Sequence, residues 1–119
     1  MSGTRLPRRL VTGFLAVAML LPTALAAGNI SGQFRAEGRN PDGSSYEGKV
    51  EIGMLGDTVA VAWQVGAKGY TGNGILDGRV LTVNWGDKFP VVYVIMPDGS
   101  LHGTWGDGRA LERLTPLDN

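Results

Sequence analysis

The sequence predicts a small all-β domain in which about eight antiparallel strands run up and down and form a closed or nearly closed barrel. Two observations predict this fold. From Ile30 onwards, apolar and polar residues alternate along most runs, which is typical of strands with one buried face. Short segments rich in Gly and Asp separate the runs, and such segments are typical hairpin turns. No stretch of ten or more residues in this part has the apolar period of a helix.

Five runs carry the alternation most plainly, at residues 30–37, 46–54, 59–65, 81–85 and 100–105. A further run, residues 91–96, is apolar on both faces. A strand of this kind is buried on both sides, so we expect its outer face to be covered by the N-terminal tail or by a partner subunit. A homodimer is one arrangement that would cover it.

Seven turn segments separate these runs: Pro41-Asp42-Gly43-Ser44, Gly56-Asp57, Ala67-Lys68-Gly69, Asp77-Gly78, Gly86-Asp87-Lys88, Pro97-Asp98-Gly99-Ser100 and Gly106-Asp107-Gly108. Seven turns imply eight strands. Consecutive hairpins leave no room for crossover connections, which gives an up-and-down order. Closing the sheet buries its apolar face and removes both free edges. A sandwich of two sheets is the alternative.

Residues 1–26 have the three zones of an export signal. Arg5, Arg8 and Arg9 precede an apolar run at 10–21, and Ala24-Leu25-Ala26 forms a small-residue end. The apolar run is shorter than the roughly 20 residues of a membrane-spanning helix. We therefore expect cleavage after Ala26, no stable membrane anchor afterwards, and a single mature domain at 27–119 that is periplasmic or secreted.

Cleavage would change the charge of the chain. All eleven acidic residues follow position 26, whereas three of the eleven basic residues precede it, so the mature chain carries a net charge of −3. This balance argues against a nucleic-acid partner or an anionic membrane surface, which both require clustered Lys and Arg. The chain has no cysteine. Its stability must therefore come from a core and a hydrogen-bonded sheet rather than from disulfides.

The residues that commonly carry catalysis or metals are scarce. The chain has one histidine, His102, which falls on the polar face of its run and is predicted to be a surface residue. No His and carboxylate cluster has zinc-site spacing, and the Asp residues beside Gly are explained as turn caps. We therefore predict a protein that is not an enzyme, with no catalytic residue, cofactor or metal.

The inward face is predicted to be aromatic and to carry no charge. Its rings are those of Phe34, Tyr46, Trp63, Tyr70, Trp85, Tyr93 and Trp105, and its glycines are Gly32, Gly48, Gly72, Gly74 and Gly103. In one interpretation the rings fill the barrel, which we favour because eight-stranded barrels are just wide enough for their own side chains. In the other, the mouth stays open and a small apolar or aromatic ligand binds to Tyr46, Trp63, Tyr70, Trp85, Tyr93 and Trp105.

Several motifs together resemble a family of small exported proteins common in α-proteobacteria, mostly hypothetical and in some cases labelled fibronectin-binding. The motifs are Asn40-Pro41-Asp42-Gly43-Ser44 with Tyr46 and Gly48, Gly56-Asp57-Thr58, Trp63, Tyr70-Thr71-Gly72 with Gly74-Ile75, Trp85-Gly86, Pro90-Val91-Val92-Tyr93, Asp98-Gly99-Ser100-Leu101 with Gly103-Thr104-Trp105, and Glu112-Arg113-Leu114-Thr115-Pro116. The resemblance covers nearly the whole mature chain. It implies an extracellular-matrix partner through the adhesion label and brings no catalytic residues.

Three functions follow as hypotheses. The first is a binding or adhesion module of unknown protein partner, working through loops or an exposed strand. The second is a carrier of a small apolar ligand in the barrel interior, as in lipocalin-like and avidin-like barrels. The third is a periplasmic inhibitor of a hydrolase that inserts the tail at residues 27–31 into its partner.

Overall fold

A computed structural model describes residues 29–117, so the export signal predicted for residues 1–26 lies outside the described part. The strands are β3 (Gly32–Arg39), β4 (Ser45–Leu55), β5 (Thr58–Val65), β6 (Lys68–Asp77), β7 (Val80–Asn84), β8 (Val91–Ile95), β9 (Leu101–Trp105) and β10 (Ala110–Pro116). They form a closed barrel in the order β10-β3-β4-β5-β6-β7-β8-β9. The predicted eight-stranded up-and-down barrel is confirmed.

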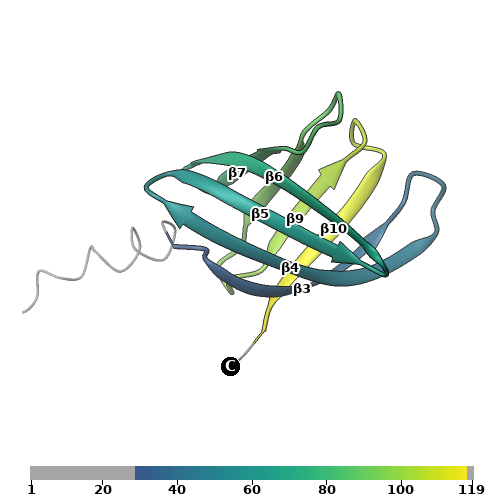
Figure 1. Cartoon of the computed structure of the whole chain (residues 1–119), viewed down its shortest axis with the longest axis horizontal. Coiled ribbons are helices and arrows are strands. Elements are labelled where there is room, and N and C mark those ends of the chain that lie inside the picture. Colours follow the sequence, from purple (N-terminus) through teal and green to yellow (C-terminus); the bar gives the residue numbers. More distant parts are fainter. Residues whose placement is uncertain (1–28, 118–119) are drawn as a thin grey trace, which may run out of the picture.

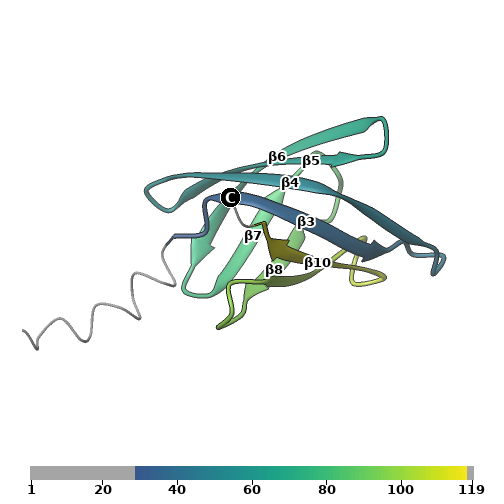
Figure 2. The same ribbon diagram turned by 90° about the horizontal axis from the view of Figure 1, so that it is seen from below.

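The barrel is flattened into two layers of different strand length. Strands β4, β5 and β6 have 11, 8 and 10 residues and lie together at the front of Figure 1, whereas β9 and β10 cross behind them. Figure 2, seen from below, separates β4–β6 from β7, β8 and β10. The first and last strands pair antiparallel from Leu111 opposite Arg39 to Pro116 opposite Phe34. This pairing closes the sheet, so that every strand has a hydrogen-bonded neighbour on both sides.

The two Pro-Asp-Gly-Ser segments form the same turn. In each, one oxygen of the Asp accepts bonds from the backbone N–H and the hydroxyl of the Ser, at 2.9 and 2.7 Å for Asp42 and Ser44 and at 2.9 and 2.6 Å for Asp98 and Ser100. The Gly between them has a φ of 89° in both turns, which a side chain would strain. Turn capping, the role predicted for these Asp residues, is therefore the one observed.

One half of the barrel interior is filled by apolar side chains, nearly all of them aliphatic. This half lies toward the β4–β5, β6–β7 and β8–β9 turns, and its buried members are Phe34, Ile52, Val59, Val61, Leu81, Ile95, Leu101 and Leu114. Ile30 closes the end of it: the side chain is 6% exposed and its backbone N–H lies 3.4 Å from the sulfur of Met54. We call this half the closed half.

The outer face of β8 differs from the prediction. Val91, Tyr93 and Ile95 point inward and are buried, but Val94 on the outer face is 42% exposed. Within residues 29–117 no segment covers Val94, so the expected cover is absent from the described part; a covering partner subunit stays a prediction. The same part of the chain contains no helix with the length and apolar character to traverse a lipid bilayer.

Candidate functional site

The other half of the barrel contains a cavity of about 270 Å³. Five aromatic side chains line it, those of Tyr46, Trp63, Tyr70, Trp85 and Trp105, together with Asn40, Val65, Val91 and Glu112. These residues lie where the strands meet the β3–β4, β5–β6, β7–β8 and β9–β10 loops. Figure 1 shows these four loops at the right and upper right of the barrel. The cavity is therefore at the end of the barrel opposite the closed half, and we call this end the mouth.

The rings form a continuous wall with Trp85 at its centre. The ring centroid of Trp85 lies 6.5 Å from that of Trp63, 6.0 Å from Tyr70 and 5.9 Å from Trp105. These pairs are edge-to-face or tilted, an arrangement that aromatic rings prefer at this spacing. The indole N–H of Trp85 donates to the carbonyl of Phe89 at 3.0 Å, which fixes the central ring. The wall is thus ordered by its own contacts.

A carboxylate lies at the base of the cavity. Glu112 on β10 points inward and is 6% exposed. The hydroxyl of Tyr46 donates to Glu112 Oε1 at 2.7 Å, and the hydroxyl of Tyr93 donates to Oε2. The indole N–H of Trp63 also reaches Oε2, at 3.2 Å. A buried carboxylate is tolerated when hydrogen-bond donors surround it in this way.

Two indole groups orient the two phenols. Trp105 donates to the hydroxyl oxygen of Tyr46 at 2.9 Å, and Trp63 donates to that of Tyr93 at 2.9 Å. An indole N–H is a donor only, so each hydroxyl accepts from the indole and keeps its own proton for Glu112. Each donor of this network, two hydroxyls and two indole N–H groups, therefore has an acceptor.

Strand register explains why these groups meet. In one row across five strands, Tyr46 on β4 lies opposite Gly38, Gly38 opposite Glu112, Glu112 opposite Gly103, and Gly103 opposite Tyr93. We call these five residues the inner row. A Cβ atom at Gly38 would overlap the ring of Tyr46, and one at Gly103 would overlap that of Tyr93. The two glycines therefore let both phenols lie across their neighbouring strands to reach Glu112.

Both phenols of the inner row stay protonated. Burial, and then the neighbouring Glu112 carboxylate, raise the pKa of the Tyr93 hydroxyl well above its ordinary value near 10. The same two causes, in the same order, raise the pKa of the Tyr46 hydroxyl. Both groups therefore remain hydrogen-bond donors to Glu112 across the neutral pH range.

The structure brings most of the predicted site residues together. Tyr46, Trp63, Tyr70, Trp85 and Trp105 line the cavity. Tyr93 is fully buried and does not line it, but its hydroxyl donates to Glu112, which does.

The interior is filled in one half and open in the other, so the favoured expectation of a filled barrel applies to the closed half alone. The predicted inward Gly32 is exposed at the barrel end, since the strand begins there.

The expectation of an uncharged interior is wrong, because Glu112 points into it. Charged residues on strands normally face water, and the outward neighbour Leu111 is apolar, so the alternation of this strand is ambiguous. One signal was present in the sequence: Glu112 alternates with the apolar residues Ala110 and Leu114 and therefore shares their face of the strand. In the structure both of these apolar residues are fully buried.

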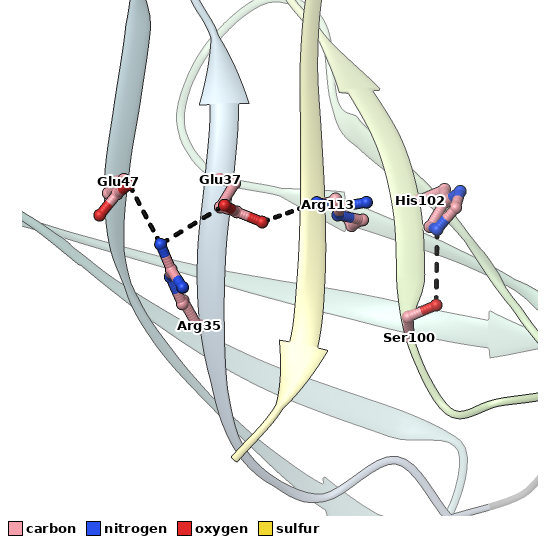
Figure 3. Close-up of polar contacts among 6 residues, drawn as sticks. All are labelled: Arg35, Glu37, Glu47, Ser100, His102 and Arg113. Atoms are coloured by element: carbon pink, nitrogen blue, oxygen red, sulfur yellow. Dashed lines mark hydrogen bonds and ion pairs between the residues drawn. The ribbon is translucent and has the colours of Figure 1, made fainter.

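The outer face of the same strands carries a second row, one residue along from the inner row. It consists of Glu47, Glu37, Arg113, His102 and Val94 in register. Figure 3 shows that Arg113 pairs with Glu37 and that Arg35 lies between Glu37 and Glu47. The N···O distances are 2.8 Å for Arg113–Glu37, 3.4 Å for Arg35–Glu37 and 3.1 Å for Arg35–Glu47. We call it the outer row.

His102 is exposed in this outer row, as predicted. Its Nε2 lies 3.4 Å from the hydroxyl oxygen of Ser100, at the long limit of a hydrogen bond. Among residues 29–117 no group of three or more His, Asp or Glu side chains is placed to hold a metal ion.

Comparison with known proteins defines the fold and nothing narrower. No protein-family model matches the chain, and no curated protein sequence matches it. Among solved structures it is similar to a redesigned β-barrel, with a TM-score of 0.56 and 13% identity over 75% of this chain and 92% of that chain. The fold and the site together describe a small up-and-down β-barrel with an aromatic cavity at one end.

Proposed function

We propose that the protein is a non-enzymatic binding protein and that it takes a small ligand into the aromatic cavity at its mouth. The observation that carries this proposal is the cavity itself, about 270 Å³ with five rings in its lining, in a barrel whose other half is filled. Ligand sites are typically concave, mainly apolar and equipped with a few polar groups. We further propose, from the signal at residues 1–26, that binding takes place in the periplasm or outside the cell.

The size and order of the cavity support a small ligand held by a preformed site. Pockets for drug-sized ligands are roughly 300–1,000 Å³, so this cavity suits a somewhat smaller molecule. The indole groups of Trp63, Trp85 and Trp105 are each fixed by a hydrogen bond. Side chains that are already ordered lose little further entropy on binding, which favours affinity.

The two alternative functions rest on less defined features. A hydrolase inhibitor would use residues 27–31 as a free tail, yet Ile30 is buried against the closed end. An adhesion module would use its loops or an exposed strand, and the exposed apolar pair there, Val94 on β8 opposite Val80 on β7, is only two residues wide. Neither of these features is as well defined as the cavity.

Intrinsic fluorescence tests the proposal directly, because all three tryptophans of the chain line the cavity. We expect a saturable quench or shift of their emission with at least one member of a panel of small apolar and aromatic compounds. Val65→Phe, which enlarges a lining side chain, should weaken binding, whereas Val94→Phe on the outer face serves as the matched control. A silent panel, or unchanged binding in Val65→Phe, would contradict the proposal.

A further inference from the structure

We infer that the ligand of this cavity is a small organic cation, an amine or quaternary ammonium group carrying apolar substituents. The inference rests on the proposed function and adds the chemical class of the ligand. Two features of the cavity lining support it: the negative charge of Glu112 at the base, and the aromatic rings of the wall.

Glu112 is the formally charged residue of the lining. Among the described residues that line the cavity there is no Lys or Arg. The groups that hold the carboxylate are two hydroxyls and one indole N–H, all neutral. They solvate the negative charge without cancelling it. An entering cation therefore meets an uncompensated negative charge, and an entering anion would be repelled.

The carboxylate also retains capacity to accept a hydrogen bond. Each carboxylate oxygen has two lone pairs. Within residues 29–117, Oε2 accepts from Tyr93 and Trp63, but Oε1 accepts from Tyr46 alone. One acceptor position therefore remains on Oε1, at the residue that forms the base of the cavity. An ammonium N–H could occupy this position, and a quaternary ammonium could rest against it by charge alone.

The walls add a second attraction for the same charge. The face of an aromatic ring carries partial negative charge, and Trp provides the strongest such face. Three of the five rings in the lining are Trp, and they are in mutual contact with Trp85 at the centre. Clusters of aromatic rings beside a carboxylate suit quaternary and substituted ammonium groups. Apolar substituents on the cation would fill the remaining volume.

The test compares two probes of the same shape that differ in charge, phenyltrimethylammonium and tert-butylbenzene, by calorimetric titration of the mature protein. We expect the cation to bind about ten-fold more tightly than its neutral counterpart. Glu112→Gln should lower this preference, measured as the ratio of the two affinities, by about ten-fold. Ile75→Ala, on the outer face of β6, is the matched control.

Variants of Tyr70 keep the inference testable if Glu112→Gln does not fold. Tyr70 is 39% exposed and makes no hydrogen bond through its hydroxyl within residues 29–117, so its replacement leaves the Glu112 network intact. Tyr70→Leu, which removes a ring, should reduce the preference for the cation more than Tyr70→Phe, which keeps one. Equal reduction by the two would argue against the ring faces as a source of the preference.

The outcomes separate the two proposals. If tert-butylbenzene binds as tightly as the cation, the inference is overturned and the proposed function stands. If neither probe binds and the wider panel is also silent, both proposals fail. Tight binding of benzenesulfonate, an anion of similar size, would overturn the inference by itself.

Discussion

The inner and outer rows cross the same five strands one residue apart, and each contains a carboxylate, yet the two are stabilised in different ways. Glu112 of the inner row is buried and held by neutral donors. Glu37 of the outer row is partly exposed and lies between two arginines. The outer charges neutralise one another in water, where such pairs contribute little. The inner charge is solvated but not neutralised, so its attraction for a cation remains available.

The largest effect should come from adding a side chain at one of the two glycines of the inner row, Gly38 or Gly103. A side chain at Gly103 would overlap the Tyr93 ring and approach the Val92 carbonyl oxygen, which is backbone and cannot move aside easily. We expect Gly103→Val to lower the free energy of unfolding by about 3 kcal/mol. Urea unfolding measures this change. Gly53→Ala is the control, since a Cβ there meets nothing within 4 Å, and a similar loss in both variants would contradict the argument.

Removing a donor from Glu112 should have the next largest effect. Tyr93→Phe deletes one hydroxyl and leaves the buried Oε2 with the Trp63 N–H as its donor. We expect a loss of about 2 kcal/mol in the free energy of unfolding, typical of a buried polar group that loses its partner. Tyr46→Phe should cost less because Tyr46 is only half-buried and water can replace its hydroxyl. The reverse order of the two losses would contradict this reading of the inner row.

Alkaline pH should lower the stability that the inner row contributes, but not the stability that the outer row contributes. The pKa of Tyr93 is raised by burial and by Glu112, so above pH 10 the unfolded chain releases the phenol proton while the folded protein keeps it. The contribution of Tyr93 to the free energy of unfolding is then fully present below about pH 10. It falls by about 1.4 kcal/mol per pH unit as the pH rises towards the pKa of Tyr93 in the folded protein. Unfolding in urea at pH 9 and pH 11 measures the slope, which Tyr93→Phe should reduce.

The smallest effect should follow a change in the outer row. Glu37→Gln removes the carboxylate that pairs with Arg35 and Arg113. Exposed ion pairs contribute little and are screened by salt, so we expect no measurable change in the urea midpoint at physiological ionic strength. Glu112→Gln, compared in the same experiment, should lower the midpoint. Equal sensitivity of the two positions would remove the distinction between the rows.

The sequence predicted the fold well because the signal for it is local. In β5, Val59, Val61 and Trp63 alternate with exposed residues, and the pattern alone places them inside. The turns are similarly local: Asp42 and Asp98 cap residues two positions away. Strand count, order and closure follow from repeating these short-range rules around the sheet.

The base of the cavity could not be predicted in this way because its partners are distant in sequence. Glu112 accepts bonds from Tyr46, 66 residues earlier, and from Trp63, 49 residues earlier. Only the register of the closed barrel brings these groups together, and no short sequence pattern around Glu112 predicts its hydrogen-bond partners. The open mouth was one of two interpretations that the sequence allowed, since whether rings fill a barrel or line a space depends on how they tilt against one another.

The pairing of β3 with β10 joins the first strand of the barrel to the last, and this has a kinetic consequence. Glu112, which forms the base of the cavity, is carried by β10, so the site is complete only after the C-terminal strand has been added to the sheet. Contacts that span most of the chain require large loops to close and tend to form late and slowly. Assembly of the barrel and formation of the cavity should therefore occur in one step at the end of folding, so that a partly folded chain has no complete cavity.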